Sequence, residues 1–204
     1  MNRGLLLVIS GPSGAGKGTV CDAYKNKCGQ RVWNSVSMTT RAPRAGEVEG
    51  ESYFFVTKEE FLEKIERDEF LEYAEVYGNY YGTPRLEVEK KLEEGFDVIL
   101  EIDIQGALNV QENTTEGIFI FILPPSMNEL KNRIIGRGSE TPESLLTRFK
   151  SAYNEINYVS KYNYAITNHK VDQAFQDLLC IVRAEKCRVT RVSNEILTLK
   201  EEEL

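Results

Sequence analysis

The residues of this chain with the clearest capacity for chemistry lie near its N-terminus, where positions 9–19 read ISGPSGAGKGT. Gly11, Gly16 and Lys17 fit the P-loop pattern G-x-x-x-x-G-K, in which backbone N–H groups and the lysine hold nucleotide phosphates. The pattern continues with Ser or Thr, whose hydroxyl binds Mg²⁺, but Gly18 stands at that position. Because an apolar run leads into Gly11 and a helix-compatible segment follows, we expect a phosphate site at a helix N-terminus. A glycine-rich turn without a ligand is the alternative.

A second candidate phosphate site lies in the Pro- and Gly-rich stretch SMTTRAPRAGEVEGESYFF, where Arg41 and Arg44 stand three residues apart. Each guanidinium group presents a fork of N–H donors that matches a phosphate group. Two solvated surface arginines are the alternative. If the P-loop binds the phosphate donor, this stretch is the candidate site for the acceptor.

Three apolar runs, residues 5–9, 98–103 and 118–123, predict buried parallel strands that would carry these loops. Each is followed by a segment compatible with a helix, such as LKNRII after the capping box of Ser126 and Glu129. Strands that alternate with helices indicate a doubly wound parallel sheet.

Two stretches interrupt this alternation. Residues 37–83 predict a small α+β insertion, with a short helix that begins at the capping box of Thr57 and Glu60. The stretch GRGSETPES at 136–144 predicts a mobile flap, in which Thr141 is the N-cap of the next helix and Pro142 its first residue.

Length and composition favour one compact α/β domain, since the chain has 204 residues. The net charge of −7 argues against nucleic acid and membrane surfaces as partners. The N-terminal run LLLVI is too short for a signal peptide, and no run approaches the ~18 apolar residues of a membrane span. We therefore expect a cytoplasmic protein.

The four cysteines, Cys21, Cys28, Cys180 and Cys187, fall as two pairs spaced seven apart in predicted helices. That spacing separates the members of a pair by roughly 10 Å along a helix, too far for a disulfide. The single histidine, His169, cannot complete a zinc site with them. We expect reduced thiols.

The order and spacing of several segments resemble those of guanylate kinases, enzymes that transfer the terminal phosphate of ATP to GMP. The segments are GPSGAGKGT, VSMTTRAPRAGEVEGESYFF, FLEYAEVYGNYYGT, EIDIQG and FILPPS with the later GRG. The resemblance implies an α/β fold with a P-loop NTPase-type parallel sheet flanked by helices, a small α+β nucleotide-acceptor subdomain and a mobile lid. Residues 1–36, 84–125 and 159–204 would form the core, 37–83 the GMP-binding subdomain and 126–158 the lid.

The resemblance also implies roles for individual residues. The ATP-binding set is Gly11, Pro12, Ser13, Gly14, Ala15, Gly16, Lys17, Gly18, Thr19 and Asn168. The GMP-binding set is Ser37, Arg41, Arg44, Tyr53, Glu72, Tyr81, Thr83 and Asp103. The catalytic set is Lys17, Arg133, Arg137 and Arg148. Because phosphoryl transfer depends on positioning and charge neutralisation, and the phosphate of GMP is already anionic, no general base is required.

Glu72 and Thr83 carry the implied base specificity. Guanine presents N1–H and N2–H₂ as adjacent donors, which suit one carboxylate, and O6 as an acceptor, which suits a hydroxyl. Adenine would place its N1 lone pair against the same carboxylate. From the residues alone, Glu72 could equally be an exposed strand acid. Thr83, which precedes Pro84, could cap the following helix.

Two positions depart from the family pattern. With Gly18 after the lysine, we expect the Mg²⁺ cofactor to be held by nucleotide phosphates and water, with Glu101 or Asp103 reaching it through water. His169 stands where the family more often has an acidic residue, so the adenine-side contacts of Asn168 stay open.

We therefore predict a guanylate kinase that converts ATP and GMP to ADP and GDP with Mg²⁺. One alternative is another nucleoside monophosphate kinase, because GAGKGT is equally similar to the adenylate and cytidylate types. The other is a guanylate-kinase-like module that binds phosphorylated peptides without catalysis, against which Lys17 in a complete P-loop argues. The sequence leaves monomer and homo-oligomer equally open.

Overall fold

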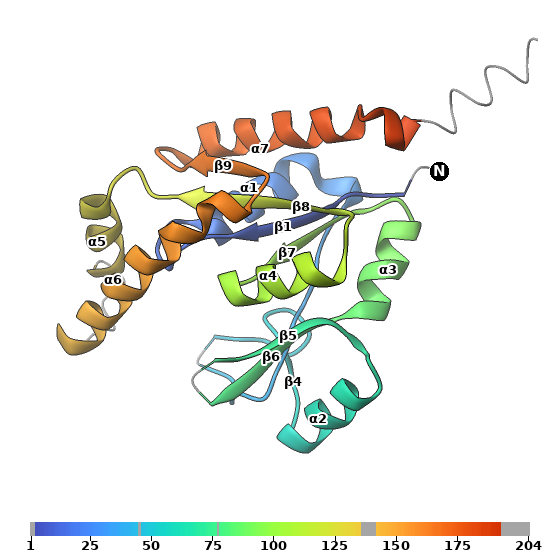
Figure 1. Cartoon of the computed structure of the whole chain (residues 1–204), viewed down its shortest axis with the longest axis horizontal. Helices are drawn as coiled ribbons and strands as arrows, with labels where there is room; N and C mark the ends of the chain where they lie inside the picture. The colour runs from blue at the N-terminus through green and yellow to red at the C-terminus, as the bar shows by residue number, and fades with distance from the viewer. Residues whose placement is uncertain (1–2, 45, 77, 136–141, 193–204) are drawn as a thin grey trace, which may run out of the picture.

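The computed structural model describes residues 3–44, 46–76, 78–135 and 142–192. The main sheet has five parallel strands in the order β2-β7-β1-β8-β9 (Figure 1). These strands are β1 Leu6–Ser10, β2 Val32–Asn34, β7 Asp97–Glu101, β8 Gly117–Leu123 and β9 Tyr164–Thr167. β1 is central, because Leu6 lies beside both Val98 of β7 and Gly117 of β8. The predicted doubly wound sheet is confirmed, although β7 ends at Glu101 and Asp103 is the N-cap of the next helix.

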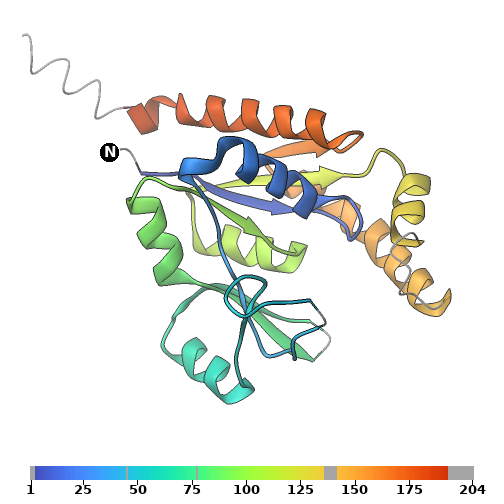
Figure 2. The same ribbon diagram turned by 180° about the vertical axis from the view of Figure 1, so that it is seen from behind.

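Helices cover both faces of this sheet (Figures 1 and 2). The pair α1 Lys17–Cys28 and α7 Val171–Lys186 covers one face, and the pair α3 Arg85–Glu93 and α4 Ile104–Asn113 covers the other. In β1, Leu7 packs in one core cluster with Val20 and Leu178, while Val8 packs in the other with Val88. Side chains alternate between the two faces of a strand, so a continuous apolar strand serves both clusters. Each such buried side chain contributes about 1.5–3 kcal/mol.

The predicted insertion is a second sheet of four strands in the order β4-β3-β6-β5. Its elements are β3 Met38–Thr39, β4 Phe54–Phe55, α2 Lys58–Glu66, β5 Phe70–Val76 and β6 Asn79–Pro84. The predicted capping box at the start of α2 is confirmed, since Thr57 Oγ1 accepts from Glu60 N and Glu60 Oε2 accepts from Thr57 N. Phe61 of α2 stacks on Phe70 of β5 with 4.4 Å between ring centroids, which fixes the helix to its sheet.

Two further helices, α5 Met127–Ile135 and α6 Pro142–Ile156, lie beside the carboxyl ends of the main-sheet strands (Figure 1). Ser126 Oγ accepts from Glu129 N, so the predicted cap of α5 is present. Leu130 of α5 and Ala152 of α6 pack in one small cluster. The short helices η1 Gly29–Arg31 and η2 Asn157–Lys161 complete the described elements. Pro142 begins α6 as predicted, while Thr141 and most of the predicted flap lie outside the described residues.

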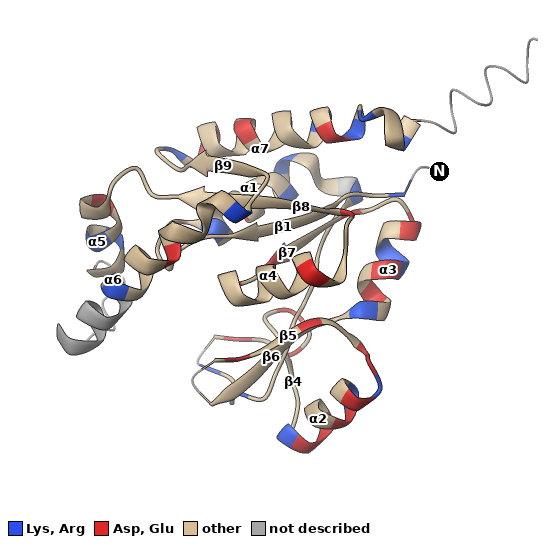
Figure 3. Ribbon diagram, in the orientation of Figure 1, with Lys and Arg blue, Asp and Glu red and all other residues tan. Residues whose placement is uncertain are grey.

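All four cysteines are free thiols, and Cys21 is buried against the sheet. Acidic and basic side chains are interspersed along α2 and α3 (Figure 3). Of the helices in the described ranges, none is long and apolar enough to cross a membrane. The same part of the chain holds no group of three or more His, Cys, Asp or Glu side chains arranged to bind a metal ion.

Candidate active site

The P-loop follows β1 directly, and its shape requires glycine at two positions. Gly11 has a φ of 140°, and a Cβ there would lie 2.3 Å from the carbonyl oxygen of Ile122. Gly16 has a φ of 92°, and its Cβ would lie 2.4 Å from Asn168 Nδ2. Gly16 is also the N-cap of α1 and supplies no side-chain bond to the first N–H groups of the helix. Those donors, at the positive end of the helix dipole, suit a phosphate group.

Lys17, the first residue of α1, folds back over this loop. Its Nζ donates to the carbonyl oxygen of Gly11 at 2.6 Å and to that of Pro12 at 3.5 Å. Burial lowers the pKa of the ammonium group, and the carboxylates of Glu101 and Glu155 oppose that shift. The positive charge therefore lies against the loop, where phosphate oxygens would be stronger acceptors than the carbonyls. Of the other predicted loop residues, Pro12, Gly14 and Ala15 are buried, and Ser13 and Thr19 are exposed.

Arg133 and Asn168, which lie outside the P-loop in sequence, both donate hydrogen bonds to its backbone. Asn168 is 3% exposed, and its Nδ2 donates to the carbonyl oxygen of Ala15 at 2.9 Å. Arg133, on α5, donates through Nη1 to the same oxygen at 3.4 Å and through Nη2 to the carbonyl oxygen of Asn168 at 3.1 Å. Its Nε donates to Glu129 Oε1 at 2.9 Å. The carbonyl oxygen of Ala15 therefore ties both α5 and the segment that follows β9 to the P-loop. The neighbouring His169 is exposed.

Gly18 lies against a carboxylate. A Cβ at this position would be 3.3 Å from both Oε1 and Oε2 of Glu101, the last residue of β7. Glu101 also lines a cavity of about 160 Å³ between the main sheet and the acceptor subdomain. Glu101 therefore lies between the P-loop and that cavity.

The cavity brings together most of the predicted GMP-binding residues. Its lining consists of Ser37, Tyr53, Glu72, Ala74, Val76, Tyr81, Glu101, Ile102, Asp103 and Gly106. A larger cavity, of about 660 Å³, lies at the opposite end of the main sheet near Arg3 and Arg188 and contains none of the predicted residues. The smaller cavity is the candidate acceptor site, because it alone of the two borders the P-loop.

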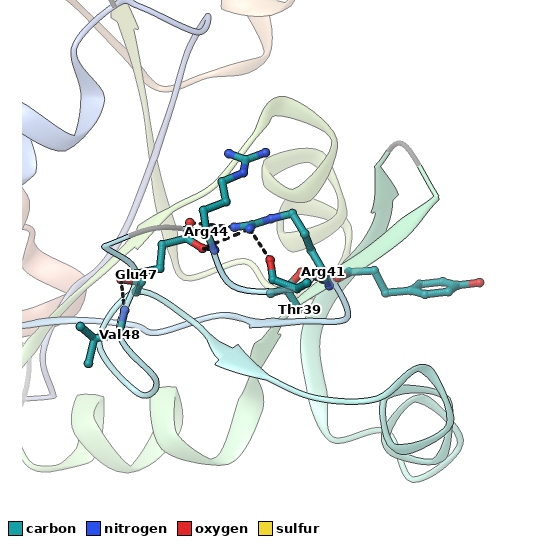
Figure 4. A network of polar contacts seen from close by, with 8 residues as sticks. Thr39, Arg41, Arg44, Glu47 and Val48 are labelled. Atoms are coloured by element: carbon teal, nitrogen blue, oxygen red, sulfur yellow. Dashed lines mark hydrogen bonds and ion pairs between the residues drawn. The ribbon is translucent and has the colours of Figure 1, made fainter. Parts of the chain in front are cut away.

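The predicted phosphate anchors lie at one side of this site, together with an acid that the sequence analysis missed (Figure 4). Arg41 donates through Nη2 to Glu47 Oε1 at 2.8 Å and through Nη1 to Glu47 Oε2 at 3.1 Å. The backbone N–H of Arg44 donates to the same Oε2 at 2.8 Å, and these bonds hold the pKa of Glu47 below its usual value. Glu47 could have been found as the acid three residues after Arg44.

Two of the tyrosines predicted to bind GMP lie beside Arg41. The rings of Tyr53 and Tyr81 meet edge to face, with 6.0 Å between centroids. The guanidinium of Arg41 lies 5.5 Å from the centroid of Tyr53, a cation–π distance. Burial raises the pKa of Tyr53, so its hydroxyl stays protonated and can donate a hydrogen bond.

At the other side of the cavity, Glu72 is 5% exposed and its Oε1 accepts from Thr83 Oγ1 at 2.6 Å. Burial raises the pKa of Glu72 to about 7, and the bond from Thr83 opposes the shift. The alternative of an exposed strand acid is therefore wrong. The alternative of Thr83 as a helix cap is also wrong, because Pro84 is the N-cap of α3 and Thr83 bonds across the hairpin to Glu72.

Asp103 lines the cavity too, but its Oδ1 accepts from Gly106 N at 2.7 Å as the N-cap of α4. Of the remaining predicted arginines, Arg137 lies outside the described residues. Arg148 belongs to α6, and its side chain lies outside the described part of the chain.

A parallel sheet whose central strand runs into a P-loop, with an inserted four-stranded sheet that borders a cavity beside that loop, is the arrangement of a P-loop kinase. The family model described as guanylate kinase matches residues 3–185, and the chain belongs to the guanylate kinase family.

Individual relatives agree. A guanylate kinase of Clostridium perfringens is 65% identical over 203 residues, which cover 100% of this chain and 94% of that protein. One from Clostridium tetani is 65% identical over 202 residues, covering 98% and 96% of the two chains. Among solved structures, a guanylate kinase from Anaplasma phagocytophilum superimposes with a TM-score of 0.77 at 36% identity, covering 94% of this chain and 90% of that one.

Proposed function

We propose that this protein transfers the γ-phosphate of ATP to GMP, giving ADP and GDP. The observation that carries the proposal is the buried carboxylate of Glu72, which faces a cavity that Glu101 joins to the P-loop. A buried acid with a hydroxyl neighbour matches the donor and acceptor groups of guanine. The phosphate anchor of Arg41 lies in the same subdomain, and membership of the guanylate kinase family supports the assignment.

The residues act by placing two phosphates in line and neutralising their charge. The N-terminus of α1 and Lys17 would hold the phosphates of ATP, and Arg41, Arg44, Tyr53 and Tyr81 would hold the phosphate of GMP. Arg133, already at the P-loop, would stabilise charge on the transferred group, with Arg137 and Arg148 as its proposed partners. The acceptor oxygen is anionic at neutral pH, so no side chain has to remove a proton.

Recognition of the base requires Thr83 to change partner. Its hydroxyl now donates to Glu72 Oε1. Guanine would supply N1–H and N2–H₂ to that carboxylate, which frees the hydroxyl of Thr83 to donate to O6. Adenine offers no N1 donor and would leave the buried carboxylate unpaired, at a cost of about 1–3 kcal/mol or more.

Mg²⁺ is the proposed cofactor, and it would supply charge neutralisation between the phosphates. Gly18 has no hydroxyl to bind it, and the carboxylate of Glu101 lies beside that glycine. Of the two predicted acids, Glu101 lies beside this P-loop glycine whereas Asp103 caps α4, so we propose Glu101 because of its position. We propose that Glu101 would hold Mg²⁺ through water, beside the nucleotide phosphates whose charge the ion would neutralise.

An assay of ADP release coupled to a spectroscopic readout, run with GMP, AMP, CMP and dTMP, tests the proposal. We expect turnover with GMP at least about 100-fold faster than with any other acceptor at equal concentration. Equal or better turnover with another acceptor would favour the second candidate, a different nucleoside monophosphate kinase. Binding of GMP without ADP release in the presence of ATP would favour a non-catalytic module.

A further inference from the structure

Helix α4 contacts the four-stranded sheet through residues to which no role has been predicted, although one of them, Gly106, lines the cavity. Gly106, Asn109 and Asn113 are spaced three and four residues apart, which places them on one face of the helix. That face lies against β5, the strand that carries Glu72. The core and the acceptor subdomain therefore meet where the base-recognising carboxylate is attached.

Two amides on this face hold the backbone of β5 on either side of Glu72. Asn109 Nδ2 donates to the carbonyl oxygen of Tyr73 at 2.8 Å, and Asn113 Nδ2 donates to that of Leu71 at 3.4 Å. Gln105 Nε2 donates to Asn109 Oδ1 at 3.0 Å, which orients the amide of Asn109. The strand needs such support, because its pairing with β6 shifts register between Phe70 and Glu72, as at a β-bulge.

Gly106 makes room for the carboxylate itself. A Cβ at this position would lie 2.9 Å from Glu72 Oε2, closer than real Cβ contacts come. The φ of Gly106 is not in the left-handed region, so the backbone conformation does not require glycine. Glycine is unfavourable in a helix interior relative to alanine. Its presence in the third position of α4 is therefore explained by the carboxylate that packs against it.

We propose that Gly106, Asn109 and Asn113 are positioning residues that set the preference of this enzyme for guanine. The face of α4 holds the backbone of β5 on both sides of Glu72 and leaves room for Oε2 at Gly106, so that the carboxylate can accept from N1–H and N2–H₂ together. The inference rests on the proposed function. It predicts that disturbing this face weakens recognition of the 2-amino group more than recognition of a 6-oxopurine that lacks it.

The test compares GMP with IMP, which lacks the 2-amino group, in Gly106→Ala and in Asn109→Ala. We expect Gly106→Ala to raise the KM and the calorimetric Kd for GMP about tenfold or more, and those for IMP less than about threefold. Asn109→Ala should raise the ratio of the KM for GMP to the KM for IMP by about threefold. The KM for ATP should change by less than about twofold in both, because the P-loop is untouched.

Glu112 is exposed on the same helix, and Glu112→Ala is the matched control. It should leave the GMP/IMP ratios of KM and of Kd unchanged. Thermal unfolding separates positioning from a general loss of structure, and if Gly106→Ala does not fold, the decision passes to Asn109→Ala. A folded variant with an unchanged GMP/IMP ratio would overturn the inference. Wild-type protein that does not bind GMP would instead overturn the proposed function, so the two failures are distinguishable.

Discussion

Arg41 and Glu47 form a two-pronged ion pair in the acceptor subdomain, with distances of 2.8 and 3.1 Å between nitrogen and oxygen atoms. The two side chains are only 13% and 20% exposed, so the pair is partly shielded from water. Within the described residues, Nε of Arg41 is buried and has no hydrogen-bond partner. Nη1 also donates to the carbonyl oxygen of Ala42 at 2.7 Å, so Glu47 and the loop backbone together orient the guanidinium group that we propose binds the phosphate of GMP.

We predict that Glu47→Gln raises the KM for GMP about tenfold with little change in the KM for ATP, because Arg41 loses the partner that orients it. Initial rates at varied GMP and ATP measure both constants. Glu51→Gln, an exposed acid in the same loop region, is the control. A lower KM for GMP in Glu47→Gln would mean that Glu47 competes with the phosphate and does not prepare its site.

GMP binding should strengthen as the pH rises through about 7, the pKa to which burial raises Glu72. The ionised carboxylate accepts from both guanine donors, whereas the protonated form accepts poorly. Calorimetric titration between pH 5.5 and 8.5 is the measurement, with buffers of different ionisation enthalpy to count the protons released. Glu72→Gln should bind GMP more weakly and keep only the pH dependence that comes from the phosphate of GMP, whose second pKa is about 6. A wild-type pH dependence no steeper than that of Glu72→Gln would contradict the prediction.

The same carboxyl group also affects stability. Its pKa is higher in the folded chain than the usual 4.5, so the folded state binds the proton more tightly than the unfolded state does. The free energy of unfolding should therefore fall as the pH rises from about 4.5 to about 7, by on the order of 3 kcal/mol. Urea unfolding of the wild type and Glu72→Gln at several pH values checks this, since the difference in unfolding free energy between the two should change with pH only within that interval.

Lys17→Ala should lower kcat by more than tenfold while the Kd for GMP stays nearly constant, because the lysine lies in the P-loop and not in the acceptor cavity. A tenfold loss corresponds to about 1.4 kcal/mol of transition-state stabilisation. Steady-state rates and GMP calorimetry on the same preparation measure the two effects. A variant that keeps more than about a tenth of the wild-type kcat would count against the assignment of the phosphate donor site.

Glu101→Gln should raise the Mg²⁺ concentration required for half-maximal activity, whereas Gly18→Ser should change it by less than about tenfold. The serine side chain would have to share space with the Glu101 carboxylate, 3.3 Å from its Cβ. Titrations of activity and of calorimetric nucleotide binding against Mg²⁺ compare the wild type and both variants. If Gly18→Ser lowered the Mg²⁺ concentration required for half-maximal activity about a hundredfold, the added hydroxyl would be a direct ligand of the ion.

Patterns that are local in sequence were sufficient to predict the parallel sheet, the P-loop and the capping box of α2. Each rests on strand alternation, helix periodicity or a motif within a few residues. The resemblance to guanylate kinases gathered Glu72, Thr83, Tyr53 and Tyr81, which the structure places around one cavity or directly beside it.

The contacts that were not predicted join residues that no local pattern relates. Glu47 pairs with Arg41 inside an irregular loop, where neither helical nor strand periodicity marks which side chains meet. Asn109 bonds the backbone of Tyr73, 36 residues earlier, and a hydrogen bond to a backbone carbonyl leaves no trace in the identity of Tyr73. The contact of Asn109 with Tyr73 depends on how α4 packs against the four-stranded sheet, which no short stretch of the sequence encodes.

The central place of β1 has a consequence for how the protein is made. Leu6 pairs with Val98 and Gly117, residues 92 and 111 positions later in the chain. Contacts of such long sequence separation form slowly, since the entropy of closing a large loop is lost before the strands gain their pairing. During synthesis the P-loop is translated well before β7, the first strand that pairs with β1, because Val98 follows Leu6 by 92 residues. The P-loop therefore gains its structural support only after distant segments of the chain have been made, including Asn168, which bonds Ala15 across 153 residues.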